Sequence, residues 1–199
     1  MDPSSDRSYE RERVEKGHLP RLSPEFYQGR AFVHWTLTVE QRATGWLTPA
    51  FHEQWRLTLL HACARYQIAC PAYVLMPDHI HLLGLGLDDH SDQRQAVEFL
   101  RKHLRAVLSP ATWQNQAHDQ VLRDSQRERG AFQTVAQYIL DNPVRAGLVS
   151  RRSDYTFLGG CVAGYPDLSV YRDDYWERFW RIYNRLVENE SEAATRSRS

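Results

Sequence analysis

The stretch Met76-Pro77-Asp78-His79-Ile80-His81-Leu82-Leu83 decides the predicted fold and site of this chain. It follows an apolar run over residues 72–76 and continues into Gly84 and Leu85, a pattern typical of a strand, a turn and a second strand. Side chains alternate along a strand, so His79 and His81 share one face while Ile80 points into the core. Because neutral histidine is the commonest metal ligand, the pair offers half of a metal site. Two histidines that serve only the packing or surface of a strand are the alternative interpretation.

A second stretch, Gln137 to Pro143, lies about sixty residues later. The residues before it repeat apolar side chains at helical spacing, which predicts a helix over residues 131–140. Pro143 bars further regular helix and disfavours helical geometry at Asn142. If the last turn nonetheless reaches Asn142, Tyr138 and Asn142 share one helix face and present a phenol beside a carboxamide oxygen. By default, a tyrosine in such a helix is a packing residue.

Two blocks in this order, MPDHIHLL at 76–83 and YILDNPVRAGLV at 138–149, resemble the REP-associated tyrosine transposases. These belong to the single-tyrosine HUH transposases, which are named for a His-hydrophobic-His motif. The segment HDQVLRD at 118–124 is also similar to the family's segment before the tyrosine helix, and the resemblance covers about residues 29–150. Two departures are present: Asp78 stands where Asn is usual, and NQAHDQ at 115–120 replaces an aromatic residue and a second histidine.

The resemblance implies a site and an activity. It implies one divalent ion, Mg²⁺ or Mn²⁺, on His79, His81 and the side-chain oxygen of Asn142, with Tyr138 as the nucleophile. Such an enzyme cleaves and rejoins single-stranded DNA beside hairpin, REP-like repeats through a 5′-phosphotyrosine intermediate. The implied partner is a single-stranded DNA hairpin, bound by a monomer or homodimer in the cytoplasm, in association with the nucleoid.

The order of elements predicts the fold class. Strands are expected at 32–39, 71–76, 79–86 and 120–123, and helices at 48–66, 92–108 and 131–140. This order is that of an α+β, ferredoxin-like (split βαβ) antiparallel sheet with the helices on one face, and the resemblance implies the same fold. A further aromatic helix at 173–187 is expected to pack on the domain, and residues 155–158 add an edge strand. On the first strand, His34 either faces the site or lies at the surface.

Four segments are expected along the chain. Residues 1–28, rich in charge and proline, predict a flexible N-terminal arm, and residues 29–152 form the transposase-like domain. Residues 153–188 form a C-terminal extension with its helix, and residues 189–199 a disordered polar tail.

The basic residues give an ambiguous signal about DNA. The formal net charge is zero, yet residues 91–152 hold ten basic and six acidic residues, and 23 of the 25 basic residues are arginines. Arginine suits phosphate contacts, and an Arg-rich composition fits a high-GC genome equally well. The candidate DNA-binding residues are Arg94, Arg101, Lys102 and Arg105, which follow the helix at 92–108, together with Arg123 and Arg145. A solvated helix face is the alternative.

Composition narrows the remaining classes. Hydrophobic residues make up 42% and charged residues 25%, as in soluble globular proteins, and no apolar run or signal-peptide layout predicts a membrane segment. The three cysteines show no CxxC spacing, so free thiols are expected and a zinc cluster is not. The histidine-triad nucleotide hydrolases are disfavoured because Leu83 stands where their third histidine would be. A nucleic-acid-binding module of this fold that lacks transposition activity is the alternative function.

Overall fold

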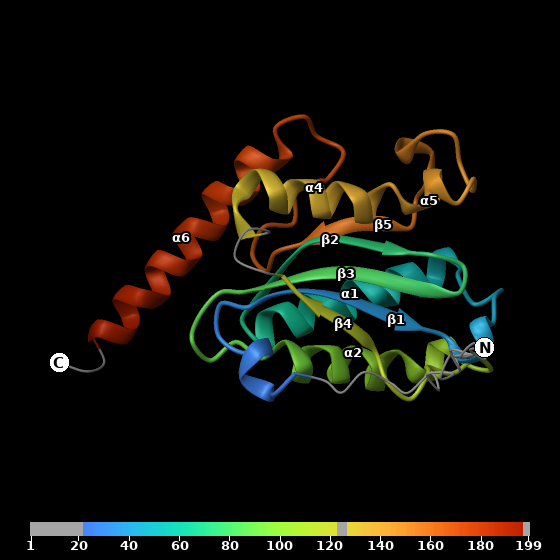
Figure 1. Ribbon diagram of the computed structural model, residues 1–199, viewed down its shortest axis with the longest axis horizontal. Coiled ribbons are helices and arrows are strands. Elements are labelled where there is room, and N and C mark those ends of the chain that lie inside the picture. The colour runs from blue at the N-terminus through green and yellow to red at the C-terminus, as the bar shows by residue number, and fades with distance from the viewer. Residues whose placement is uncertain (1–21, 123–126, 197–199) are drawn as a thin grey trace, which may run out of the picture.

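The computed structural model describes residues 22–122 and 127–196, with side chains to residue 189, as an α+β domain built on one five-stranded sheet (Figure 1). The strands are β1 (Phe32–Thr38), β2 (Ile68–Leu75), β3 (His79–Gly86), β4 (His118–Val121) and β5 (Leu158–Cys161). The helices are α1 (Pro49–Arg65), α2 (Gln93–Leu108), α4 (Arg129–Leu140), α5 (Asn142–Arg145) and α6 (Tyr175–Arg196). Short 3-10 turns occur at Pro24–Tyr27, Glu40–Arg42 and Arg152–Asp154. None of the described helices is long and apolar enough to cross a bilayer.

The sheet has the order β4-β1-β3-β2-β5, and every neighbouring pair is antiparallel. The first four strands and two helices follow one another as β1-α1-β2-β3-α2-β4, which confirms the predicted ferredoxin-like arrangement. Two short strands are shifted along the chain: β4 begins at His118, and the edge strand beside β2 begins at Leu158. Tyr155, expected in that edge strand, instead donates its hydroxyl to the Leu75 carbonyl oxygen at 2.5 Å.

Helices cover both faces of the sheet, so the prediction that they all lie on one face is wrong. Val33, Trp35 and Leu37 of β1 pack with α1 and α2 on the first face. Leu83 and Leu85 of β3 pack with α4 and α6 on the second face (Figure 1). The physical reason is visible in β2, all eight of whose residues are buried, since a strand covered on both sides is apolar throughout.

The helix starts follow ordinary capping chemistry. The Thr48 hydroxyl accepts a hydrogen bond from the Phe51 backbone N–H at 3.1 Å, and Pro49 occupies the first turn, as predicted. Asp92 caps α2 by accepting from the Gln95 backbone N–H at 2.9 Å. The cap therefore fixes the start of α2 at Gln93, after the turn that follows β3, the strand that carries the histidines.

Both ends of the domain extend beyond its predicted limits. Residues 24–28, assigned from the sequence to the N-terminal arm, join the domain because the Tyr27 side chain is fully buried. Its hydroxyl donates to Asp119 Oδ2 at 2.5 Å. At the other end, α6 runs to Arg196, so the prediction of a disordered tail from residue 189 is wrong for the backbone of residues 189–196, which is helical. The helix buries Phe179, Trp180 and Tyr183 against the second face, which is the predicted packing role.

Phe132 of α4 joins the second core to α6. Its ring centroid lies 5.2 Å from Trp180 and 5.4 Å from Phe32, and the side chain is fully buried. We expect Phe132→Ala to lower the free energy of unfolding by about 3–5 kcal/mol, because the substitution leaves a cavity. Chemical denaturation measures the loss, and Gln137→Ala, at an exposed position of the same helix, is the control expected to change little. Equal stability of the two variants would contradict the packing of α4 described above.

Candidate functional site

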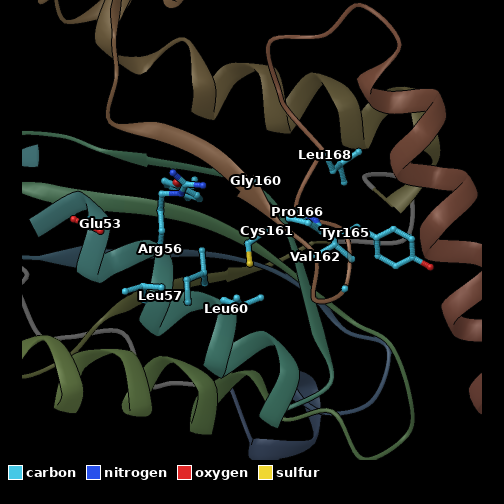
Figure 2. A pocket seen from close by; sticks show the side chains of 13 residues that line it. Glu53, Arg56, Leu57, Leu60, Gly160, Cys161, Val162, Tyr165, Pro166 and Leu168 are labelled. Atoms are coloured by element: carbon cyan, nitrogen blue, oxygen red, sulfur yellow. The ribbon is translucent and has the colours of Figure 1, made fainter. Parts of the chain in front are cut away.

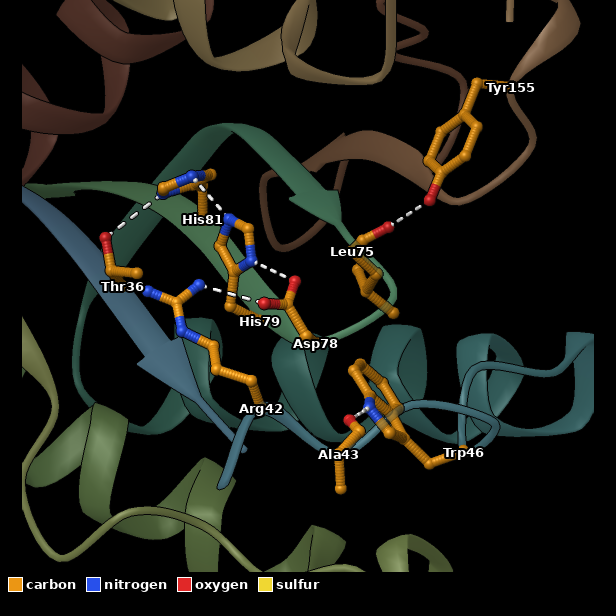
Figure 3. Close-up of polar contacts among 9 residues, drawn as sticks. All are labelled: Thr36, Arg42, Ala43, Trp46, Leu75, Asp78, His79, His81 and Tyr155. Atoms are coloured by element: carbon orange, nitrogen blue, oxygen red, sulfur yellow. Dashed lines mark hydrogen bonds and ion pairs between the residues drawn. The ribbon is translucent and has the colours of Figure 1, made fainter. Parts of the chain in front are cut away.

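His79 and His81 lie side by side on the second face of the sheet, as the alternation of β3 predicts. Their neighbours in that strand, Ile80 and Leu82, point into the first core. The two Nε2 atoms are 3.0 Å apart (Figure 3). The two outer nitrogens are therefore close enough together to bind one ion.

The orientation of His79 is fixed by a carboxylate. Asp78 Oδ1 lies 2.6 Å from His79 Nδ1, and Asp78 Oδ2 accepts from Arg42 Nη1 at 2.9 Å (Figure 3). Burial alone would raise the pKa of the Asp78 carboxyl, but hydrogen bonds from Arg42 and His79 outweigh it and hold this pKa below its usual value. A carboxylate on Nδ1 selects the tautomer that leaves Nε2 with a free lone pair.

His81 is held from the neighbouring strand. Its Nδ1 lies 3.1 Å from Thr36 Oγ1 and 3.1 Å from His34 Nε2, so His34 faces the site and is not a surface residue. Burial is the main cause that lowers the pKa of His81 to about 3, and burial also lowers the pKa of His34 to about 4. The imidazoles of His81 and His34 are therefore neutral at neutral pH, and neutral imidazole is the form that binds a metal.

Thr36 and Arg42 were missed by the sequence analysis. The alternation of β1 puts His34 and Thr36 on the same polar face, and this pattern could have identified Thr36. In the β1–β3 register, Thr36 pairs directly with His81. No sequence pattern pointed to Arg42. It follows β1 in a turn where its φ is 54°, a left-handed conformation that is rare for this residue type.

The spacing of the histidines suits a hexacoordinate divalent ion. Two ligands at about 2.1 Å from an ion and at right angles are about 3.0 Å apart. The observed 3.0 Å between the Nε2 atoms matches this value. Among the side chains that the structure describes, in residues 22–122 and 127–189, no group of three or more His, Cys, Asp or Glu is arranged to hold a metal. A third protein ligand would thus have to be another kind of group, such as the amide oxygen of Asn142.

Asn142 sits where two helices meet. α4 ends at Leu140, and α5 begins at Asn142, with Pro143 in its first turn, where the missing N–H is not needed. Asn142 Nδ2 donates to the carbonyl oxygens of Tyr138 at 3.2 Å and Ile139 at 2.9 Å. Carbonyl oxygens only accept, so the amide nitrogen must face α4 and Oδ1 is the atom left for a ligand.

Tyr138 is carried by the helix that covers the face on which the histidines lie. Its neighbours Ile139 and Leu140 are buried in the second core, whereas Tyr138 is 54% exposed. The guanidinium of Arg145 lies 3.8 Å from the centre of the Tyr138 ring. No hydrogen bond within the described parts of the chain joins the Tyr138 hydroxyl to either histidine. The structure thus brings the two histidines together and places Tyr138 and Asn142 in the layer above them.

No protein-family model matches this chain, and no curated protein matches it in sequence. Among solved structures, a REP-associated tyrosine transposase bound to a REP hairpin is similar, with a TM-score of 0.60. The likeness covers 71% of this chain and 81% of that chain at 20% identity. The chain has the fold of that transposase. At this identity the likeness establishes the transposase fold alone, and the chemistry depends on the residues of the site.

Within this transposase fold, the predicted DNA-binding residues do not form one surface. Arg94, Arg101, Lys102 and Arg105 lie on α2, which covers the face of the sheet opposite the histidines. Arg101 donates to the carbonyl oxygens of Gln114 and Asn115, and the Arg94 guanidinium lies 5.8 Å from the Tyr27 ring centroid. Lys102 and Arg105 are exposed.

The other two candidates are separate. Arg123 lies outside the described residues, and Arg145 is beside Tyr138 on the histidine side of the sheet. Among the predicted DNA-binding residues that the structure describes, Arg145 therefore lies next to Tyr138, the predicted nucleophile.

Proposed function

We propose that this protein is a metal-dependent enzyme that cleaves and rejoins single-stranded DNA beside hairpin repeats, through a 5′-phosphotyrosine on Tyr138. The observation that carries the proposal is the 3.0 Å approach of the His79 and His81 Nε2 atoms on the face that α4 covers. The fold shared with a transposase that was solved bound to a REP hairpin supports it. The protein would act as a monomer or homodimer, with DNA in the cytoplasm.

The residues of the site supply a fixed set of ligands. His79, His81 and Asn142 Oδ1 would hold Mg²⁺ or Mn²⁺, and the ion would neutralise the negative charge that builds at the phosphorus. Asp78 keeps the His79 ring in one tautomer, and Thr36 and His34 hold the His81 ring. These hydrogen bonds fix both rings before DNA binds, so no free energy is spent on orienting them during the reaction.

Tyr138 is the proposed nucleophile. Its hydroxyl oxygen attacks the phosphorus, the bond between phosphorus and the 3′ oxygen breaks, and the leaving strand takes a proton to become a 3′-hydroxyl. A free phenol has a pKa of about 10, so the proton must be lost at or before attack. The new phosphotyrosine bond retains the phosphodiester energy, and rejoining therefore needs no nucleoside triphosphate. Arg145, whose guanidinium lies beside the ring, would contact the neighbouring phosphate.

A nucleic-acid-binding module without strand cleavage is the second candidate. One observation favours it: the Tyr138 hydroxyl makes no hydrogen bond to the histidines in the described part of the structure. The two candidates differ in one product, the covalent link between protein and DNA.

The deciding experiment uses hairpins taken from inverted repeats near the gene, with single-stranded flanks and a label at the 3′ end. We expect a labelled protein band that survives denaturation, forms with Mg²⁺ or Mn²⁺ and is lost in EDTA. The 3′ label reports the adduct because Tyr138 stays attached to the 5′ end of the downstream fragment. Hairpin binding with no covalent band in the presence of metal would establish the binding module instead.

Asp78 gives a separate test of the metal site. We expect Asp78→Ala to weaken Mn²⁺ binding, measured by calorimetry, by about 10- to 100-fold, because the His79 ring loses the group that orients it. Asp78→Asn keeps an oxygen that accepts from Nδ1–H, so a smaller loss is expected.

The control for Asp78 is Arg42→Ala, which removes the ion pair and leaves the carboxylate in place. It is expected to have a small effect, since the Arg42 side chain is 63% exposed. Undiminished Mn²⁺ binding by Asp78→Ala would contradict the role of Asp78.

A further inference from the structure

A pocket lies at the β5 edge of the sheet, apart from the histidine site. It has a volume of about 440 Å³ and is lined by residues of α1, β2, β5 and the loop over residues 162–168 (Figure 2). Its walls are largely apolar and include Leu57, Leu60, Val162 and Leu168. Polar side chains also line it, among them the carboxylate of Glu53, the guanidinium of Arg56 and the thiol of Cys161. The pocket therefore gives solvent and small molecules a route to a cysteine.

The three cysteines of the chain lie close together at this pocket, and each belongs to a different element. Cys161 of β5 pairs directly with Cys70 of β2, and Cys63 Sγ of α1 lies 4.0 Å from the Cys161 carbonyl oxygen. All three are free thiols. Cys63 and Cys70 are fully buried, whereas Cys161 is partly exposed. A reagent that enters the pocket thus meets Cys161 first.

The surroundings of Cys161 favour its thiolate. A hydrogen bond from the Cys63 side chain is the main cause that lowers the pKa of Cys161, and the charge of Arg56 acts in the same direction against burial. The same hydrogen bond and burial raise the pKa of Cys63. Arg56 forms no hydrogen bond or ion pair with another described residue. A lowered pKa, access and a neighbouring second thiol are features of a cysteine that is oxidised reversibly.

We propose that Cys161 is a site of reversible thiol oxidation by small hydroperoxides and that Cys63 is its resolving thiol. Cys63 is assigned this role, and not Cys70, because the Cys63 thiol is directed at Cys161 itself, whose carbonyl oxygen lies 4.0 Å away, whereas the Cys70 thiol donates to the Ala72 carbonyl oxygen at 3.5 Å. The product is a disulfide that joins α1 to β5.

The chemistry balances in two steps. The Cys161 thiolate attacks a peroxide oxygen, an S–O bond forms, the O–O bond breaks, and the alcohol or water leaves with a proton. The Cys63 sulfur then attacks the sulfenic acid, an S–S bond forms, the S–O bond breaks, and water leaves with the proton of Cys63. Two thiols are oxidised, and one hydroperoxide is reduced.

The test treats the full-length protein with a small excess of hydrogen peroxide under native conditions. We expect the intact mass to fall by two hydrogen atoms, peptide mapping to link Cys63 to Cys161, and a thiol reductant to reverse both changes. Iodoacetamide given before peroxide should label Cys161 first and prevent the link. A chain that keeps all three thiols, or that links Cys161 through Cys70, would overturn the proposal.

Two variants separate the cysteines. Cys70→Ala is the matched control, at the buried partner position in β2, and should still form the link. Cys63→Ala should lose the link and let Cys161 proceed to sulfinic acid, seen as a gain of two oxygen atoms. If Cys63→Ala does not fold, the labelling order and peptide map of the unaltered protein decide the matter. Labelling of Cys63 or Cys70 ahead of Cys161 would refute the assignment.

Discussion

Tyr138→Phe is expected to abolish covalent attachment of the protein to a 3′-labelled hairpin, a loss of at least about a thousandfold. The substitution removes one oxygen atom, and that atom is the one proposed to form the bond to phosphorus. The ring itself is kept, so its stacking with the Arg145 guanidinium is kept as well. Hairpin binding should therefore change little, and a gel-shift titration in the same buffer checks this.

The control for this variant is Tyr171→Phe. Tyr171 is 50% exposed, against 54% for Tyr138, and its hydroxyl donates to the Tyr155 carbonyl oxygen at 2.9 Å. Loss of that hydroxyl should leave the adduct at the level of the unaltered protein. An undiminished adduct with Tyr138→Phe would remove Tyr138 from the proposed role, whereas equal losses in both variants would point to a general effect on the protein.

His81→Ala is expected to reduce metal-dependent cleavage at least about a hundredfold, the second of the two largest effects. His81 is the centre of the histidine cluster: its Nε2 meets His79, and its Nδ1 meets both Thr36 and His34. Its removal deletes one proposed ligand and leaves the His79 ring without its neighbour. His79→Ala should have a similar effect, and EDTA should reproduce the loss with the unaltered protein.

His90→Ala provides the comparison, because His90 is an exposed histidine in the turn between β3 and α2. It should cleave as the unaltered protein does. Mn²⁺ titrations of both variants separate lost metal binding from lost folding, since a folded His81→Ala protein should still bind the hairpin. Cleavage that persists in EDTA, or in His79→Ala and His81→Ala alike, would rule out the proposed metal site.

Much of the architecture was predictable because it depends on local spacing. The alternation of β3 put His79 and His81 on one face, and Thr48-Pro49 marked the start of α1. The order of strands and helices was enough for the ferredoxin-like topology, which the structure confirms. The unbroken apolar run of β2 carried a signal for helices on both faces, but the prediction placed them on one.

The sequence by itself determined which residues share a strand face or a helix turn, since these follow from fixed local periods of the backbone. Only the tertiary structure decided which residues from other elements meet them. The β1–β3 register set Thr36 beside His81, the turn after β1 brought Arg42 to Asp78, and the crossing of the chain put α2 and its arginines on the far face. Such contacts depend on strand pairing and on where the chain crosses the sheet, and the spacing of residues along one element determines neither.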